Sequence, residues 1–278
     1  MESTAFVRRE AEGIIYYSCT ALESLPQLRH AFSTRHGGTS PLPSQALNLG
    51  NVPWDERAHV MENRRRFLSA LTLTLSSLVT VSQIHSAAFH IIKSRADQWN
   101  PRTPGDGLAT SAEGLALAVQ VADCFPVLIA DPHSGAIAAV HAGWRGAHAR
   151  ILSRTVAGMQ RSLGADPANL LVAIGPGIRG CCFEVGEEVA TAFDAEFPGA
   201  RLCSPSLHKP GKHILDLPRS LKLQLAEAGV RHEAVSDLGL CTRCNPKDFF
   251  SHRAEGAHCG RMMAVICRTT SHAPWRTR

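Results

Sequence analysis

Long apolar stretches are missing from this 278-residue sequence, and none approaches the roughly 20 residues that a membrane-spanning helix needs. The first residues, Met1-Glu2-Ser3-Thr4, lack the basic-then-apolar order of a secretory signal peptide. A disulfide scaffold is not expected either, because the nine cysteines are scattered through a chain long enough to bury a core of its own. We therefore predict a cytoplasmic protein with reduced thiols and no membrane partner.

Several motifs that would identify a cofactor or a partner are also missing. The sequence contains neither a glycine-rich dinucleotide fingerprint nor a Walker phosphate loop, and it lacks the repeated His-x-His motifs of blue multicopper oxidases. The net charge of +5 is not gathered into a basic stripe; its densest spots are the run 64–66 and the last few residues. A nucleic-acid partner is therefore not expected, whereas a small anionic or phosphorylated ligand suits this charge.

No internal repeat or low-complexity linker divides the chain, so we predict one domain over residues 1–278, with a ragged N-terminus and a disordered tail after about residue 269. Short apolar or alternating runs predict strands at 13–17, 30–33, 78–84, 89–92, 115–121, 127–130, 136–140, 170–174 and 262–266. Helical patterns cover 57–71, 147–163, 187–197 and 217–228. Because several consecutive strands have no helix between them, the order predicts an α/β (α+β) fold with mixed sheets and outer helices.

Three side chains that can bind a metal stand where predicted strands end. His85 follows the strand at 78–84, Cys124 follows the strand at 115–121, and His141 follows the strand at 136–140. Strand ends are positions where rigid elements direct side chains into a common site. Zinc accepts imidazole and thiolate together, and three protein ligands leave a fourth position for water, as in catalytic zinc sites. Such a water has a pKa of about 7.

Other interpretations of the cysteines stay open at this point. A cysteine after an apolar strand is often a small buried hydrophobic residue, and the sequence separations within His85, Cys124 and His141 match no local zinc spacing rule. Cys241 and Cys244 have the spacing of a zinc knuckle, but no well-spaced second pair follows, so we predict a structural turn there. The neighbours at 181 and 182 are interpreted as buried packing.

Positive and polar residues near the same strand ends are candidates for an anion site. Arg145 lies in the turn that opens the predicted helix 147–163, where free N–H groups favour an anion. Arg64 lies on the predicted helix that follows the loop containing Asn48. Asp123 stands beside Cys124, where it would act as a general base or orient a neighbouring ligand. A surface salt bridge explains either arginine equally well.

Read in order, a series of motifs becomes recognisable. They include Gln83-Ile84-His85, Gly105-Asp106-Gly107, Ala122-Asp123-Cys124-Phe125-Pro126 and His141-Ala142-Gly143-Trp144-Arg145-Gly146. The Ala-Asp-Cys and His-Ala-Gly-Trp-Arg-Gly motifs are highly specific in combination, whereas either alone is weak. From about residue 31 to 266 the chain resembles the YfiH-like purine nucleoside phosphorylase family, which has also been catalogued as polyphenol oxidase or laccase and as a peptidoglycan editing factor. The resemblance implies a four-layer α/β/β/α sandwich with mixed sheets.

The resemblance also implies a catalytic zinc on His85, Cys124 and His141. The implied activities are phosphorolysis of adenosine, inosine and methylthioadenosine to the free base and ribose 1-phosphate, and deamination of adenosine. The implied partners are therefore a purine nucleoside and phosphate. Arg64 and Arg145 are our candidates for holding the phosphate, and Asn48 is a further candidate for the substrate or phosphate site.

Some residues depart from the family pattern, and other functions remain in competition. Gly177 and Cys259 replace a common cysteine and a common threonine, which affects the outer pocket and hence substrate preference. One alternative is a Cys-His amidase that acts on a peptidoglycan precursor, with Cys124 as nucleophile and His141 as base. A second is a copper-dependent polyphenol oxidase with copper at the same three ligands. A third is a non-catalytic module that binds nucleosides.

Overall fold

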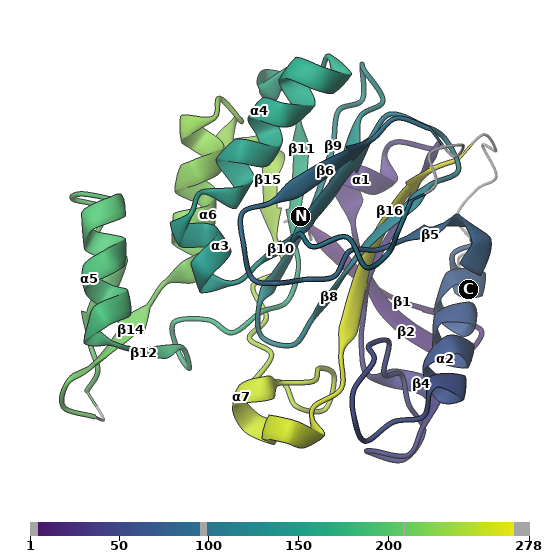
Figure 1. Ribbon diagram of the computed structural model, residues 1–278, viewed down its shortest axis with the longest axis horizontal. Helices are drawn as coiled ribbons and strands as arrows, with labels where there is room; N and C mark the ends of the chain where they lie inside the picture. The colour runs from purple at the N-terminus through teal and green to yellow at the C-terminus, as the bar shows by residue number, and fades with distance from the viewer. Residues whose placement is uncertain (1–4, 95–98, 208, 270–278) are drawn as a thin grey trace.

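Two six-stranded mixed sheets form the centre of the molecule in the computed structural model, which describes residues 5–94, 99–207 and 209–269 (Figure 1). In spatial order the first sheet contains β1 (Phe6–Ala11), β2 (Ile14–Cys19), β3 (Leu28–Ser33), β16 (Met262–Arg268), β8 (Ala116–Val121) and β5 (Leu78–Val79). The second contains β15 (Val235–Asp237), β11 (Leu171–Ile174), β9 (Phe125–Ala130), β10 (Ile137–Ala142), β7 (Gly107–Thr110) and β6 (Phe89–Ile92). Antiparallel pairs dominate, and β5–β8, β6–β7 and β11–β15 are parallel, so the predicted mixed sheets are confirmed.

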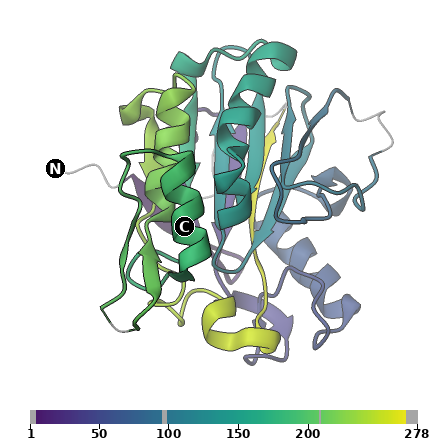
Figure 2. The same ribbon diagram turned by 60° about the vertical axis from the view of Figure 1, so that its left-hand side comes forward.

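The longer helices cover the outer faces of both sheets. The described residues form seven helices: α1 (Thr20–Glu23), α2 (Arg57–Ala70), α3 (Trp144–His148), α4 (Ile151–Leu163), α5 (Glu187–Glu196), α6 (Leu217–Glu227) and α7 (His252–Glu255). Helix α2 lies on one side of the molecule, and α4 and α6 lie side by side on the other (Figures 1 and 2). A short third sheet of β12 (Glu184–Gly186), β14 (Lys212–Leu215) and β13 (Cys203–Pro205) adjoins α5, and β4 (His36–Ser40) adjoins α2.

Alternate residues of the central strands enter different cores, which explains why these strands are apolar throughout. In β16, Ala264 and Ile266 pack between the two sheets, whereas Met263 and Val265 pack with Phe67 of α2. The strands of the second sheet divide in the same way between the inter-sheet core and the core under α4 and α6. Strands buried on both faces show no polar alternation. The layers are thus helix, sheet, sheet and helix, which confirms the predicted α/β/β/α sandwich.

Several element predictions need correction. The N-terminus is not ragged from residue 5 on, because β1 pairs along its whole length with β2. The strand predicted at 78–84 joins the sheet only at Leu78–Val79, and Ser82 forms one isolated bridge, to Pro104, before the chain reaches the site. The helix predicted at 147–163 is two helices, separated at Arg150, whose φ of +60° is left-handed. Residues 270–278, predicted as a tail, lie outside the described residues.

The sharp break at Arg150 is supported by contacts of its own side chain. A left-handed conformation costs a non-glycine residue about 1 kcal/mol. Arg150 forms ion pairs with Glu196 and Glu227, donates to the Glu196 carbonyl at 3.0 Å and lies over the ring of Phe197. These contacts join the start of α4 to the ends of α5 and α6. No helix among the described residues is both long and apolar enough to cross a membrane.

His30 gives the first sheet a pH-dependent stability that can be measured. It is fully buried on β3, accepts the Cys19 N–H at 2.8 Å, and burial lowers its pKa to about 3. Below its ordinary pKa of about 6.5 the unfolded chain binds a proton that the folded chain rejects. The stabilisation is therefore complete above pH 6.5 and is lost toward pH 3, at up to about 1.4 kcal/mol per pH unit.

We expect His30→Gln to flatten this part of the curve of unfolding free energy against pH, because glutamine keeps an acceptor but does not titrate. Denaturant unfolding at several pH values between 3 and 7 measures it. His133→Gln changes an exposed histidine and is the control. A wild-type slope retained in His30→Gln would contradict the expectation.

Candidate active site

Three segments that leave the sheets at one end of the sandwich bring His85, Cys124 and His141 together. His85 lies in the connection from β5 to β6, Cys124 lies in the short connection from β8 to β9, and His141 lies near the end of β10. Both connections run from the first sheet to the second. The donor atoms of the three side chains lie within 4.8 Å of one another, and the two imidazole rings meet edge to face at 4.9 Å. The three predicted residues thus form one group that could hold a metal ion.

Asp106 is hydrogen-bonded to both histidines of this group, and the sequence analysis assigned it no role. Its carboxylate is fully buried and accepts the His141 Nδ1–H at 2.9 Å, which leaves Nε2 of His141 for the site. It also accepts the backbone N–H of His85 at 3.0 Å and that of Ser86 at 2.6 Å. One carboxylate therefore fixes the orientation of His141 and the path of the loop that carries His85. A carboxylate behind a histidine in this way is common at metal centres.

The backbone around the three residues is strained and closely packed. His85 and Asp123 have left-handed φ values of +58° and +83°, which non-glycine residues adopt at a cost of about 1 kcal/mol or more. Gly143 leaves room where a Cβ would lie 3.0 Å from the Cys124 sulfur and 3.3 Å from the His85 ring. The His-Ala-Gly motif thus reflects a position at which the site itself excludes a side chain.

The electrostatics of the group favour an ionised sulfur. Burial opposes ionisation of Cys124, but the charges and hydrogen bonds of His141 and His85 outweigh it and lower the pKa of Cys124 to about 6. Burial likewise disfavours a charged His141, but Cys124 and Asp106 outweigh it and raise the pKa of His141 to about 9. Hydrogen bonds from His141 and Ser86 lower the pKa of Asp106 against the opposing effect of burial. The Cys124 thiol, the His141 imidazole and the Asp106 carboxylate therefore influence one another's ionisation.

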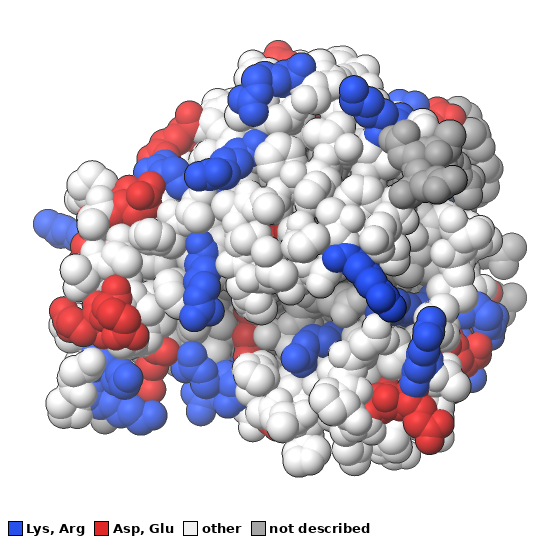
Figure 3. All heavy atoms as spheres, in the orientation of Figure 1, with Lys and Arg blue, Asp and Glu red and all other residues white. Residues whose placement is uncertain are grey.

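A cleft of about 1000 Å³ opens above the group, and basic side chains line it. Figure 3 shows Lys and Arg side chains around a hollow near the middle of this face. The arginines of the cleft are Arg57, Arg64, Arg102, Arg145, Arg253 and Arg261. Only two acidic residues, Asp55 and Asp123, line the cleft among the described residues, and both carboxylates are occupied by protein donors. The cleft is therefore suited to an anionic ligand.

The two predicted phosphate-binding arginines both reach this cleft. Arg64 donates its Nε to the Leu49 carbonyl at 2.9 Å, and burial lowers its pKa, so a nearby anion would relieve an unfavourable charge. Arg145 is exposed on α3, and its guanidinium lies 4.5 Å from the centre of the Trp144 ring. Within the described residues neither guanidinium has a carboxylate partner. The other four, Arg57, Arg102, Arg253 and Arg261, were not anticipated, because nothing in their local sequence links them to the cleft.

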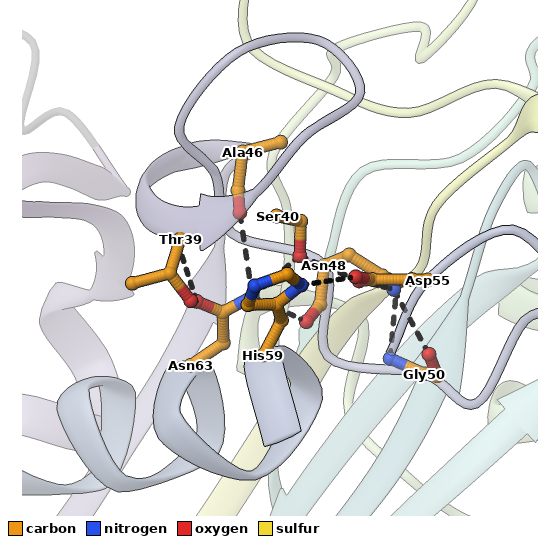
Figure 4. Close-up of polar contacts among 8 residues, drawn as sticks. All are labelled: Thr39, Ser40, Ala46, Asn48, Gly50, Asp55, His59 and Asn63. Atoms are coloured by element: carbon orange, nitrogen blue, oxygen red, sulfur yellow. Dashed lines mark hydrogen bonds and ion pairs between the residues drawn. The ribbon is translucent and has the colours of Figure 1, made fainter. Parts of the chain in front are cut away.

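Asn48, the third residue predicted for the substrate or phosphate site, is not among the residues that line the cleft. Its amide is fully buried, donates to Asp55 at 2.7 Å and to the Gly50 carbonyl, and accepts the Gly50 N–H (Figure 4). It also accepts the Arg261 N–H. Asn63 binds the Asn48 carbonyl from α2. Asn48 thus positions Asp55 and Arg261, which do line the cleft.

Asp123, the neighbour of Cys124, is hydrogen-bonded to residues of the C-terminal part of the chain. Its carboxylate accepts the Thr242 hydroxyl at 2.6 Å and the Arg253 N–H at 2.6 Å, and its carbonyl accepts the Ile178 N–H. Both oxygens of the carboxylate are therefore occupied. This arrangement favours the positioning role for Asp123 over that of a general base.

The cysteines outside this group do not lie as predicted. Cys181 is exposed and Cys182 half-buried, so they are not buried packing, and the structure brings them to Cys241 and Cys244. The interpretation of 241–244 as a turn is confirmed, since Asn245 N–H donates to the Cys241 carbonyl. It was incomplete, however, because the four sulfurs form a second group within 4.8 Å.

Comparison with known proteins places this site in a family. The family described as “Multi-copper polyphenol oxidoreductase laccase” matches residues 29–269. The chain belongs to this family. Among YfiH-like relatives, the chain is 41% identical over 239 residues to a protein of Deinococcus radiodurans named purine nucleoside phosphorylase, covering 85% of this chain and 88% of that protein.

Solved structures of the YfiH-like family share the fold. The crystal structure of YlmD from Geobacillus stearothermophilus has a TM-score of 0.85 and 33% identity, covering 96% of this chain and all of that one. That of YfiH from Bacillus licheniformis has a TM-score of 0.83 and 29% identity, covering 94% and 98%. The names of the curated relatives indicate a family of the purine nucleoside phosphorylase kind.

Proposed function

We propose that this chain is a zinc-dependent purine nucleoside phosphorylase, converting adenosine, inosine and methylthioadenosine with phosphate into the free base and ribose 1-phosphate, and that it also deaminates adenosine. The observation that carries the proposal is the meeting of His85, Cys124 and His141 at the base of an arginine-lined cleft. The names of the relatives support the phosphorylase part. The deaminase part is supported by the resemblance of the motifs and by the donor set.

The residues present fit a zinc ion. Two imidazoles and one thiolate are donors that zinc accepts, and three protein donors leave a position for a substrate or water. Asp106 sets His141 so that its Nε2 faces the site, and Gly143 keeps the space between the donors clear. When bound, zinc supplies an electrophilic centre that polarises oxygen and acidifies water.

The cleft residues supply the binding and orientation that phosphorolysis needs. The attacking phosphate must be held close to the anomeric carbon of the ribose, and arginine guanidiniums bind phosphate through paired N–H donors. Arg64 and Arg145 border the same cleft as the metal group and are free of carboxylate partners within the described residues. Asp55 and Arg261 line the same cleft and are positioned by the buried Asn48, and Arg64 is held by its bond from Nε to the Leu49 carbonyl.

Loss of a phosphate-binding arginine should separate the two activities. We expect Arg145→Gln to raise the KM for phosphate about 10- to 100-fold, since a charged hydrogen bond contributes about 1.5–3 kcal/mol. Deamination of adenosine without phosphate should change little. Steady-state kinetics of both reactions in the same preparation measures the difference.

The matched control is Arg154→Gln, which removes an exposed arginine on α4 that does not line the cleft. Arg64→Gln should act as Arg145→Gln does, with some loss of stability from the Leu49 contact. An unchanged KM for phosphate in both cleft variants would exclude these arginines from the phosphate site.

The test of the proposed function is chromatography of adenosine incubated with the protein, with and without phosphate. Adenine formed only when phosphate is present demonstrates phosphorolysis, and inosine formed without phosphate demonstrates deamination. Formation of neither product by a preparation that contains zinc would overturn the proposal. Inosine and methylthioadenosine tested in parallel give the substrate preference.

The same residues also have the geometry of a nucleophilic triad, which supports the amidase alternative. The donor atoms of Cys124 and His141 lie within 4.8 Å of each other, and His141 is hydrogen-bonded to the buried Asp106. A triad has no need of His85, whose donor atom also points into the group, and this favours a metal. One equivalent of metal that co-purifies, together with loss of activity on chelation, would reject the triad; turnover of a peptidoglycan precursor by metal-free protein would establish it.

Copper at the same three donors remains the third candidate, since imidazole and thiolate also bind copper. The family description names copper, but no His-x-His motif accompanies it in this sequence. Metal analysis after purification without added metal decides between zinc and copper. Oxidation of a phenol by the copper-loaded protein, without nucleoside turnover, would favour the oxidase.

A further inference from the structure

A second sulfur-rich group lies outside the proposed active site. It joins two loops: the turn after β11 that carries Cys181 and Cys182, and the turn before α7 that carries Cys241 and Cys244. The Cys244 sulfur lies 3.5 Å from that of Cys181 and 3.4 Å from that of Cys182, and all four sulfurs lie within 4.8 Å of one another. Four cysteines from distant parts of the chain thus converge on one point.

The spacing of the sulfurs fits a shared metal ion. With Zn–S bonds of about 2.3 Å, tetrahedral geometry places thiolate sulfurs about 3.8 Å apart, within the range observed here. A disulfide would require a separation of about 2.05 Å. Because Cys244 is almost equally far from two sulfurs, it is not matched to either as a disulfide partner.

The backbone around Cys241 supports the same interpretation. The turn at 241–245 is closed by a hydrogen bond from Asn245 N–H to the Cys241 carbonyl, and that at 179–183 by bonds from the Cys182 and Phe183 N–H groups to the Arg179 carbonyl. Two closed turns that each present a pair of cysteines toward one point are suited to hold a metal ion through four thiolates.

We propose that Cys181, Cys182, Cys241 and Cys244 bind a structural zinc ion through four thiolates. Four protein donors leave no position for a substrate, so this centre stabilises structure and does not catalyse. It is separate from the group of His85, Cys124 and His141 and shares no residue with it.

The position of this centre connects it to the cleft. Gly177 and Cys241 form a bridge between the same two loops, and the neighbouring Thr242 binds Asp123 beside Cys124. Ile178 and Phe183 of the first loop line the cleft. The ion would therefore fix the wall of the cleft by joining two loops that have only short secondary structure of their own.

The test is metal content of the full chain after purification under reducing conditions without added metal. We expect two equivalents in the wild type, one in Cys244→Ser and one in Cys124→Ala, because each variant removes a donor from a different centre. Cys203→Ser, which changes a half-buried cysteine outside both groups, should retain two. In the Cys124→Ala protein, cadmium should produce a thiolate charge-transfer band that is absent from Cys124→Ala/Cys244→Ser.

A second measurement shows whether the Cys244→Ser protein is still folded. Amide hydrogen exchange in Cys244→Ser should rise in residues 177–184 and 240–249 and stay as in the wild type in the central strands. Free reaction of all four thiols with an alkylating reagent in a folded wild type that holds only one equivalent would overturn the proposal, as would a disulfide among them in the reduced preparation. If the wild type and Cys124→Ala both hold one equivalent and Cys244→Ser holds none, the four-thiolate centre stands and the catalytic metal fails.

Discussion

Replacement of Cys124 by alanine is expected to abolish phosphorolysis and deamination together, with a loss of about 10³-fold or more in kcat/KM for each. The sulfur is one of only three donors in the proposed catalytic centre, and two imidazoles alone would bind zinc weakly. A metal electrophile contributes several kcal/mol to transition-state stabilisation, and each 1.36 kcal/mol corresponds to a tenfold change in rate. Product chromatography and metal analysis of the same sample measure both effects.

The fold should survive this change. Cys124 lies in the connection between β8 and β9 and belongs to none of the hydrophobic clusters, so its truncation opens no cavity in the core. Circular dichroism and the melting temperature should stay close to the wild type, apart from stabilisation that the bound ion itself provides. Cys203→Ala, outside both sulfur-containing groups, is the matched control. Undiminished turnover by a Cys124→Ala protein free of zinc would show that this thiolate takes no part in the chemistry.

His85→Ala separates the metal site from the Cys–His–Asp triad. Both interpretations require Cys124, so loss of activity in Cys124→Ala alone does not distinguish them. His85 is a donor only in the metal interpretation, since the triad consists of Cys124, His141 and Asp106. A His85→Ala protein that has lost both the metal and turnover is expected, whereas a fully active metal-free one would support the triad.

The apolar patterns predicted the centre of the fold well because burial on both faces leaves a clear signal. β9, β10, β11 and β16 all coincide with predicted strands. The missed strands are those without that signal. The strand at Phe6–Ala11 carries three consecutive charged residues at the edge of a sheet, and the strand at Gly107–Thr110 is only four residues long and begins with glycine. Both segments are strands because of the neighbours with which they pair in the sheet, and the local sequence does not encode that pairing.

The break in the predicted helix 147–163 had no local signal either. Neither glycine nor proline stands at residue 150, and the left-handed Arg150 is supported by Glu196 and Glu227, which lie far along the chain. The site residues likewise divide into those with a local sequence signal and those without one. His85, Cys124 and His141 were identified because each follows a recognisable strand, and motif resemblance joined them.

Asp106 and the four-cysteine group show where local sequence stops being informative. Asp106 meets His141 only because β7 pairs with β10, and nothing near residue 106 reveals that pairing. Considered alone, the cysteine pair at 181 and 182 was interpreted as buried packing. The fold brings the knuckle pair of Cys241 and Cys244 to them, so that all four sulfurs lie within 4.8 Å of one another. Long-range pairing therefore determines both features.

Asp106→Asn is expected to weaken metal binding about 10- to 100-fold and to lower kcat/KM by a similar factor or more. One carboxylate oxygen accepts from His85 N–H and His141 Nδ1, and the other accepts from the Ser86 N–H and hydroxyl. Asparagine has a single acceptor oxygen. Whichever way the amide turns, its NH₂ group faces either the donors of His85 and His141 or the donor of Ser86, so a buried donor loses its partner at a cost of about 1–3 kcal/mol.

Asp131→Asn is the matched control for this variant, because it removes charge from another buried aspartate without touching the site. Asp131 accepts the His133 N–H, the Ser134 hydroxyl and the Asp166 N–H in the turn that follows β9. Both variants should lose stability, but only Asp106→Asn should lose metal affinity, measured by competition with a chromophoric chelator. If the two variants fall equally in melting temperature while Asp106→Asn binds metal and turns over adenosine as the wild type does, the carboxylate supports the fold alone. The orientation of His141 would then have to come from the β10 backbone, whose His141 N–H is bound to the Asp106 carbonyl at 2.7 Å in either protein.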